Sequence, residues 1–245
     1  MRLPLSSAIA ERLDVLDETG STNAVLVERA RAGTEPEFSV VMTTSQTAGR
    51  GRLGRTWVAP PGKTIAVSVL LAPPTNDRLG WLPLLAGLAM TRAVRSLVTE
   101  YPVTLKWPND VQVDGLKVSG LLAELVPGAG VVIGAGLNLT MDESELPTPV
   151  STSLTLVGAS ADDLIDRALA GYLGELRGLY EGMLAGADIR AQVTAECDTI
   201  GRRVRVELPG GDDLYGTATG IDAEGRLVVD GRAIAAGDVT HLRYE

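Results

Sequence analysis

Three arginines and three glycines lie within seven residues, from Gly49 to Arg55, in the order GRGRLGR. Arginine carries a planar set of N–H donors that matches the oxygens of phosphates and carboxylates. Glycine allows backbone N–H groups to approach the same anion closely. Because the whole chain is acidic, with a formal net charge of -9, this positive charge is local. The segment predicts a binding loop for a small polyanion such as a nucleotide, and a solvated basic turn is the alternative.

The residues around this arginine loop exclude two common kinds of phosphate-binding loop. A β-rich run, Ser39 to Ser45, precedes it, and a Pro-Pro-Gly break followed by a second apolar run, Thr64 to Leu71, comes after it. The loop therefore lies between two predicted strands, on the kind of rigid support that usually carries binding loops. It is not a Walker loop, because no Gly-Lys-Ser/Thr closes it, and not a Rossmann fingerprint, because a strand rather than a helix follows.

A cluster of small polar residues opens the first predicted helix. Ser21 or Thr22 fits the N-cap position of a helix over Asn23 to Ala32, which Gly33 ends. A cap is the simpler interpretation of these residues. Since the N–H groups at a helix start are also free, the cluster is a candidate site for the polar head of a ligand.

Lysine is rare, with three lysines against nineteen arginines, and two of the three lie in one predicted meander. These two are Lys106 and Lys117. The strands of the meander are expected at Thr104 to Trp107, Val111 to Val113, Lys117 to Leu125 and Val131 to Asn138, with a hairpin turn at Asp114-Gly115. A compact point charge on a rigid strand is a candidate catalytic group, and a surface lysine is the alternative.

Composition excludes several kinds of site. One cysteine, Cys197, rules out an internal disulfide framework and a cysteine-cluster metal site, and one histidine, His241, argues against a histidine-based zinc site and a Ser-His triad. We expect no metal site built from the chain itself. No stretch approaches the roughly 18 uncharged apolar residues of a membrane span, and the first residues lack the apolar core of a secretory signal. We expect a cytoplasmic protein, and the acidic balance argues against sequence-independent binding of DNA.

The remaining elements indicate two domains. Helices are expected over Leu79 to Val98, Ala161 to Leu184 and Asp188 to Cys197. From Arg203 onward, short strands alternate with Gly- and Asp-rich turns, which is typical of a small all-β barrel. We therefore expect a larger domain over residues 1–198 and a barrel over residues 199–245, for which a hydrophobic content of 45% supplies both cores.

Four motifs carry a resemblance to a known family: GRGRLGR, KWPND at 106–110, GLKVSGLLAE at 115–124 and GAGLN at 134–138. In this order they resemble the biotin protein ligases, and the resemblance extends from Ser21 through the C-terminal strands. It implies an α+β fold of the class II synthetase and biotin–lipoate ligase type, in which a mixed or antiparallel sheet with packed helices precedes a small C-terminal SH3-like β-barrel. The larger domain would then be the catalytic domain that binds biotin and ATP.

The resemblance implies an ATP-dependent ligase with a two-step reaction. The carboxylate of biotin attacks the α-phosphate of ATP, bound with Mg2+, and gives biotinyl-5′-AMP and pyrophosphate. A specific lysine on the biotin carboxyl carrier protein domain of a carboxylase, acetyl-CoA carboxylase or a related one, then attacks the adenylate and releases AMP. Because the first step brings two anions together, cations must neutralise both in a partly dehydrated site.

The motifs of the family imply roles for the charged residues. Lys117 would bridge the biotin carboxylate and the α-phosphate and later stabilise the departing AMP. The residues that would fold over biotin and the phosphates are Gly49, Arg50, Gly51 and Arg52. Arg55 would contact pyrophosphate or hold the closed loop. Asp110, with Asn109, would organise the ATP end or receive the ammonium of the incoming lysine, and a plain turn-forming role is the alternative for Asp110.

The remaining matches surround the two substrates. Positions that hydrogen-bond the ureido ring of biotin and its neighbouring groups correspond to Ser21, Thr22, Asn23 and Gln46. Positions where strand backbone lines the pocket correspond to Gly120 and Gly136, and positions near the adenine correspond to Trp57 and Asn138. Because the arginine loop combines glycines with positive charge, we expect it to be mobile without ligand and to close on an anion, which would exclude water from the adenylate.

Two other functions stay open on the sequence alone. A ligase of the same fold could use lipoate or octanoate, but a linear acyl chain needs an apolar tunnel, and the polar residues at 21–23 and Gln46 would then have less to do. The second alternative function is that of a non-catalytic adaptor with an acidic binding surface. The presence of Lys117 and of an intact arginine loop argues against this function. Since only twenty residues precede Ser21, we expect no DNA-binding domain and no repressor function, and we expect a monomer or a weak homodimer.

Overall fold

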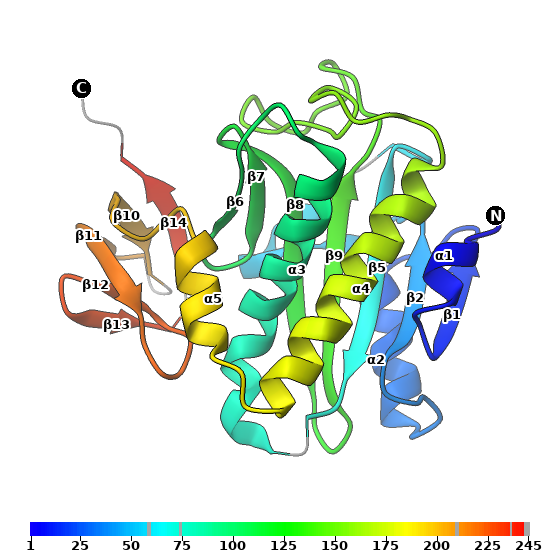
Figure 1. The fold of residues 1–245 in the computed structure, drawn as a ribbon, viewed down its shortest axis with the longest axis horizontal. Helices are drawn as coiled ribbons and strands as arrows, with labels where there is room; N and C mark the ends of the chain where they lie inside the picture. Colours follow the sequence, from blue (N-terminus) through cyan, green and yellow to red (C-terminus); the bar gives the residue numbers. More distant parts are fainter. Residues whose placement is uncertain (58–59, 74, 209–210, 236, 243–245) are drawn as a thin grey trace.

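A mixed sheet of seven strands forms the centre of the larger domain, in the order β1-β2-β5-β9-β8-β7-β6 (Figure 1). The computed structural model describes residues 1–57, 60–73, 75–208, 211–235 and 237–242. β1 and β2 are parallel, and all other neighbouring strands of this sheet are antiparallel. The strands are β1 (Arg12–Leu16), β2 (Ser39–Thr43), β5 (Thr64–Leu71), β6 (Val103–Lys106), β7 (Asp110–Val113), β8 (Leu116–Val126) and β9 (Gly130–Asn138).

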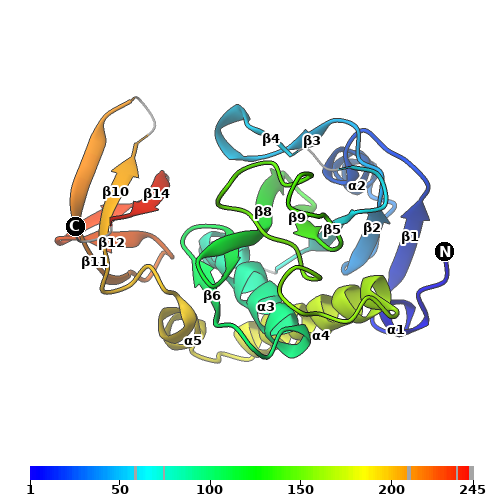
Figure 2. The ribbon, with the colours of Figure 1, turned by 90° about the horizontal axis from the view of Figure 1, so that it is seen from above.

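Helices cover both faces of the sheet (Figure 2). On one face, α3 (Leu82–Leu97) and α4 (Leu164–Leu184) pack together, with α1 (Pro4–Ser7) against α4 and α5 (Ile189–Glu196) against α3. On the other face, α2 (Thr22–Arg31) lies against β2, β5, β8 and β9. Because the central strands are covered on both faces, they are apolar, and every residue of β5 is buried.

A second sheet of five antiparallel strands follows α5, in the order β13-β12-β11-β10-β14. Two buried tryptophans of the larger domain donate to the turn between β11 and β12: Trp81 Nε1 to the carbonyl of Ala223 at 2.8 Å and Trp107 Nε1 to that of Gly225 at 3.4 Å. These bonds fix the position of the second sheet beside the first. Its strands are β10 (Arg203–Glu207), β11 (Asp213–Ile221), β12 (Leu227–Val229), β13 (Arg232–Ile234) and β14 (Asp238–His241).

The predicted α+β fold, with a mixed sheet and an all-β unit at the C-terminus, is confirmed. The predicted meander is confirmed as β6 to β9. The helix expected from Leu79 begins as a 3-10 turn, η2 (Asn76–Trp81), and becomes α-helical at Leu82, where Pro83 occupies the first turn. Residues 243–245, at the end of the predicted barrel, lie outside the described residues. Within the described ranges, no helix has both the length and the apolar character that a membrane span requires.

Candidate active site

A pocket lies on the face of β8 and β9 that is turned toward α2. Its floor contains the cross-strand pairs Gly120–Gly136 and Leu122–Gly134. The arginine loop, the first turn of α2, the turn between β6 and β7 and the start of β14 supply most of the remaining lining, together with Gln46 and with Ala66 of β5. The pocket is therefore built from segments that lie far apart in the sequence and from both sheets.

The arginine loop is a small hairpin over this floor. It consists of β3 (Gly49–Arg50), a 3-10 turn η1 (Arg52–Gly54) and β4 (Thr56–Trp57), and Gly51 N donates to the carbonyl of Arg55 at 2.7 Å. A Cβ atom at position 49 would lie 2.5 Å from the backbone oxygen of Trp57, so only glycine fits there. The loop therefore carries its arginines on a folded support.

Two arginines of the loop bind other parts of the chain. Arg52 Nη1 donates to Asn109 Oδ1 at 3.2 Å, and burial lowers the pKa of Arg52, while the charges of Asp110 and Asp238 oppose that shift. Arg55 Nη2 lies 2.5 Å from Asp238 Oδ2, and this hydrogen bond raises the pKa of Arg55. The loop is thus tied to the turn between β6 and β7 and to β14 of the second sheet.

Lys117 and Asp110 form an ion pair inside the pocket, with Lys117 Nζ 2.6 Å from Asp110 Oδ1. Their side chains are 34% and 21% exposed, so the pair is accessible to a ligand. The ammonium of Lys117 also lies 5.9 Å from the centre of a Trp57 ring. The pocket therefore holds a compact cation beside a carboxylate and next to an aromatic ring.

A β-bulge turns Lys117 toward the pocket. β7 and β8 pair Val111 with Ser119 but Gln112 with Lys117, so Val118 is an extra residue on β8. Val118 is fully buried in the hydrophobic core. In a regular strand of the same sequence, without the bulge, Lys117 would share the face of Ser119, two positions on, which pairs with buried residues of the core side. The bulge places the ammonium on the pocket face instead.

The first turn of α2 presents polar groups to the pocket. Ser21 is the N-cap, and its Oγ accepts from Ala24 N at 3.4 Å. Gln46 Oε1 accepts from Thr22 N at 3.0 Å and from Thr22 Oγ1 at 3.3 Å. This use of the amide oxygen orients the NH2 group of Gln46 as a donor for a ligand. The predicted cap and the predicted ligand site coincide at this helix end.

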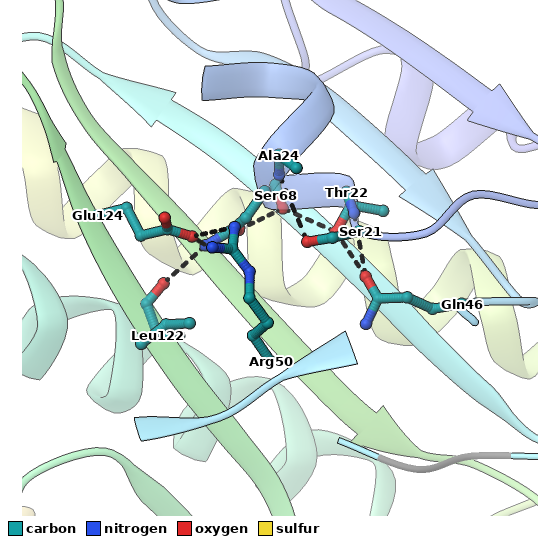
Figure 3. A network of polar contacts seen from close by, with 9 residues as sticks. Ser21, Thr22, Ala24, Gln46, Arg50, Ser68, Leu122 and Glu124 are labelled. Carbon is teal, nitrogen blue, oxygen red and sulfur yellow. Dashed lines mark hydrogen bonds and ion pairs between the residues drawn. The ribbon is translucent and has the colours of Figure 1, made fainter. Parts of the chain in front are cut away.

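Behind these groups, a chain of polar contacts connects α2 with the arginine loop (Figure 3). The hydroxyl of Ser68, on β5, lies 2.6 Å from Asn23 Oδ1 and 2.8 Å from Thr22 Oγ1. Asn23 Nδ2 donates to Glu124 Oε1 at 2.7 Å, and the same oxygen accepts from Arg50 Nη2 at 3.1 Å. The third arginine of the loop is thereby tied to β8 and, through Asn23, to α2.

Trp57 covers the glycines of the floor. A Cβ atom at Gly136 would lie 2.4 Å from the Trp57 ring, and one at Gly120 would lie 3.2 Å from it. The indole Nε1 is buried and has no hydrogen-bond partner among the described residues. Glycine at these two positions therefore allows a flat ring to lie directly on strand backbone.

Most residues singled out in the sequence lie together around this pocket. Those that line it are Ser21, Thr22, Asn23, Gln46, Arg50, Gly51, Arg52, Arg55, Trp57, Asn109, Asp110, Lys117, Gly120 and Gly136. Gly49 and Asn138 are not among the lining residues. Asn138 is buried and donates to the carbonyl of Thr152 at 2.9 Å, so it holds the segment after β9.

Three residues of the site had not been predicted: Ser68, Glu124 and Asp238. Glu124 was visible as the one acidic residue in the strand run LKVSGLLAELV. Ser68 and Asp238 gave no signal, because their partners are 45 and 183 positions away in the chain. The described residues contain no group of three or more His, Cys, Asp or Glu side chains that would hold a metal ion.

Known proteins share both the sequence and the fold. Residues 15–138 match the biotin/lipoate A/B protein ligase family, and residues 199–242 match the biotin protein ligase C terminal domain. The chain is 44% identical over 241 residues to the biotin–[acetyl-CoA-carboxylase] ligase of Mycobacterium tuberculosis, covering 95% of this chain and 90% of that protein. It is 30% identical over 225 residues to the bifunctional ligase/repressor BirA of Escherichia coli, covering 88% and 68%. The structure of the biotin protein ligase from Aquifex aeolicus in complex with biotin and ATP matches with a TM-score of 0.77 at 27% identity, covering 96% of this chain and 100% of that chain.

Proposed function

The chain belongs to the biotin/lipoate A/B protein ligase family and, within it, to the biotin protein ligases. We propose that it is a biotin–[acetyl-CoA-carboxylase] ligase and that the reaction takes place in the pocket on β8 and β9. The observation that carries this function is the convergence of Lys117 and the arginine loop on one pocket whose other wall is the polar first turn of α2. Such a pocket suits a molecule with a polar ring at one end and a carboxylate that must meet a phosphate at the other.

In the first step, a carboxylate oxygen of biotin forms a bond to the α-phosphorus of ATP, and pyrophosphate leaves. Both partners are anions, so the barrier falls when fixed cations lie against the developing charge. Lys117 bridges the carboxylate and the α-phosphate in this proposal. Its ammonium already binds one carboxylate, that of Asp110, at 2.6 Å, which supports its capacity to hold another. Arg50 and Arg52 cover the phosphates, and Arg55 binds pyrophosphate or holds the loop closed.

In the second step, a lysine amine of the carrier domain of the carboxylase attacks the acyl carbon of biotinyl-5′-AMP, and AMP leaves. The incoming side chain arrives as an ammonium and must lose a proton before it attacks. Asp110 is the carboxylate beside Lys117 and is partly exposed, so we assign it to receive that ammonium. Asn109, whose oxygen accepts from Arg52, holds the loop near the ATP end.

The polar ring of biotin lies at the first turn of α2 in this proposal. The ureido group offers two N–H donors and a carbonyl acceptor, which match the hydroxyls of Ser21 and Thr22, the Asn23 amide and the NH2 group of Gln46. Trp57 moves with the loop and covers the adenine, and Asn138 supports the segment that follows β9. Magnesium enters bound to the phosphates of ATP, since its usual ligands there are phosphate oxygens and water.

The test is the formation of acyl-adenylate from ATP by the purified protein, with biotin, lipoate and octanoate in parallel. We expect adenylate with biotin alone, and transfer to a carrier domain of acetyl-CoA carboxylase when that domain is added. Adenylate with lipoate in place of biotin would contradict the proposed substrate. No adenylate with any of the three acids would contradict the proposed enzyme activity.

A further inference from the structure

Two residues behind the pocket fix the orientation of the Asn23 amide. Asn23 Nδ2 faces two acceptors, Glu124 Oε1 at 2.7 Å and the carbonyl of Leu122 at 3.3 Å, while Asn23 Oδ1 faces the hydroxyl of Ser68 at 2.6 Å (Figure 3). An amide oxygen only accepts, so a flipped Asn23 would place its oxygen against both acceptors. The arrangement therefore permits one orientation of the amide.

Ser68 and Glu124 do this from outside the pocket lining. Ser68 is fully buried on β5, and its hydroxyl also contacts Thr22 Oγ1 at 2.8 Å. Asn23 and Thr22 are themselves buried in the first turn of α2. The two hidden residues thus hold the position of the polar groups that α2 turns toward a ligand.

Glu124 has a second partner, and the same oxygen serves both. Its Oε1 accepts from Asn23 on α2 and, at 3.1 Å, from Arg50 on the arginine loop. The carboxylate therefore joins the wall that faces the polar ring of a ligand to the loop that covers its charged end. The side chains of Arg50 and Glu124 are 50% and 27% exposed, so water screens their ion pair, and the bond to Asn23 is the more sheltered of the two.

We propose that Glu124 and Ser68 are positioning residues for the polar ring of biotin, and that Glu124 links the binding of that ring to the placement of Arg50. This inference rests on the proposed ligase function and deepens it. Neither residue touches the reacting atoms. Ser68 acts through Asn23 and Thr22, and Glu124 acts through Asn23 and Arg50, so their removal weakens the binding of the substrates rather than the chemical step.

The experiment compares the Michaelis constants of four variants in the biotin-dependent formation of adenylate. Ser68→Ala removes the donor to Asn23, and we expect the KM for biotin to rise about tenfold. Glu124→Ala removes the acceptor of Asn23 and the partner of Arg50, and we expect a rise of about thirtyfold. Glu124→Gln keeps one acceptor oxygen, so we expect a smaller rise of about threefold. The double variant of Ser68→Ala and Glu124→Ala should not exceed Glu124→Ala by more than about twofold, because both changes act through one amide.

Two matched controls remove the same groups elsewhere. Ser39 on β2 is also buried, and its hydroxyl has no hydrogen-bond partner among the described residues, so Ser39→Ala should leave the KM for biotin unchanged. Glu28 is exposed on α2, so Glu28→Ala tests the loss of one negative charge on the same helix. Thermal unfolding of every variant establishes that the compared proteins are folded.

The pattern of constants separates positioning from a structural role. In Ser68→Ala the KM for biotin rises, while kcat and the KM for ATP stay within about threefold of the wild type. In Glu124→Ala, which also releases Arg50, the KM for ATP rises together with the KM for biotin, and kcat stays within about threefold. A merely structural role would lower kcat through a smaller active fraction and leave the KM for biotin unchanged, which would overturn the inference. A double variant in which the rise of the KM for biotin equals the product of the two single rises would also overturn the inference. Wild-type protein that makes no adenylate would overturn the proposed function and this inference with it.

Discussion

Replacement of Lys117 by alanine tests the charge on which the proposed chemistry depends. At an effective dielectric constant of about 20, two unit charges about 3 Å apart attract each other by about 5 kcal/mol. The Lys117 side chain is 34% exposed, so water screens part of this attraction, and we expect about 3–4 kcal/mol to be lost from the transition state. The kcat/KM for adenylate formation should therefore fall by about 10²–10³.

Lys63 provides the control for this replacement. It forms an ion pair with Glu145 at 3.2 Å, outside the pocket lining, and its side chain is 37% exposed, close to that of Lys117. The variants Lys117→Ala and Lys63→Ala each lose one partly exposed ion pair. The free energy of unfolding should change by less than about 1 kcal/mol in both.

The assay measures pyrophosphate release with biotin and ATP, together with chemical unfolding of each variant. Only Lys117→Ala should lose activity. A loss of less than about tenfold in Lys117→Ala would refute the anion-bridging role of the lysine. An equal loss in Lys63→Ala would refute it too, because the effect would then follow from the lost ion pair and not from its position.

Three further predictions concern stability, packing and loop closure. Burial and the charge of Lys106 lower the pKa of His241 to about 4, so the folded state keeps this histidine neutral down to a lower pH than the unfolded state does. The stability that the neutral histidine contributes is therefore complete above pH 6.5 and lost as the pH falls toward 4. Urea unfolding should show a loss of about 1–2 kcal/mol over that range, and the variant His241→Gln should abolish this loss. Gly136→Ala should displace the Trp57 ring, which would lie 2.4 Å from the new Cβ, and shift the tryptophan emission to longer wavelength; unchanged emission would contradict this packing. Trypsin should cut within residues 50–55 more slowly when biotin and ATP are both present, and equal cleavage in both states would contradict loop closure.

Local patterns in the sequence predicted much of the site. The arginine loop, the cap at Ser21 and the hairpin turn at Asp114-Gly115 each depend on neighbouring residues, so single segments indicate them. The fold class followed from the order of such segments and from the family resemblance. The strand β1 was missed because its five residues are only partly buried at the edge of the sheet.

The missing parts of the site depend on contacts between distant segments. The bond between Arg55 and Asp238 spans 183 positions and joins the arginine loop to the second sheet, so no local pattern indicates it. The same holds for Ser68, whose hydroxyl looks like an ordinary residue of a buried strand until β5 is placed under α2. Asn138 stands in a motif of the family, yet its side chain bonds the segment after β9 and does not line the pocket.

The bulge at Val118 makes the chemistry of this protein depend on residue count as well as residue type. Any apolar side chain that fits the core at this position leaves the ammonium of Lys117 on the pocket face. Insertion of one residue between Lys117 and Ser119 would instead turn the ammonium into the apolar interior, where an unpaired charge is costly. This strand will therefore accept changes of side chain more readily than added residues. A library of substitutions there should retain many active members, and a library of single-residue insertions between Lys117 and Ser119 almost none.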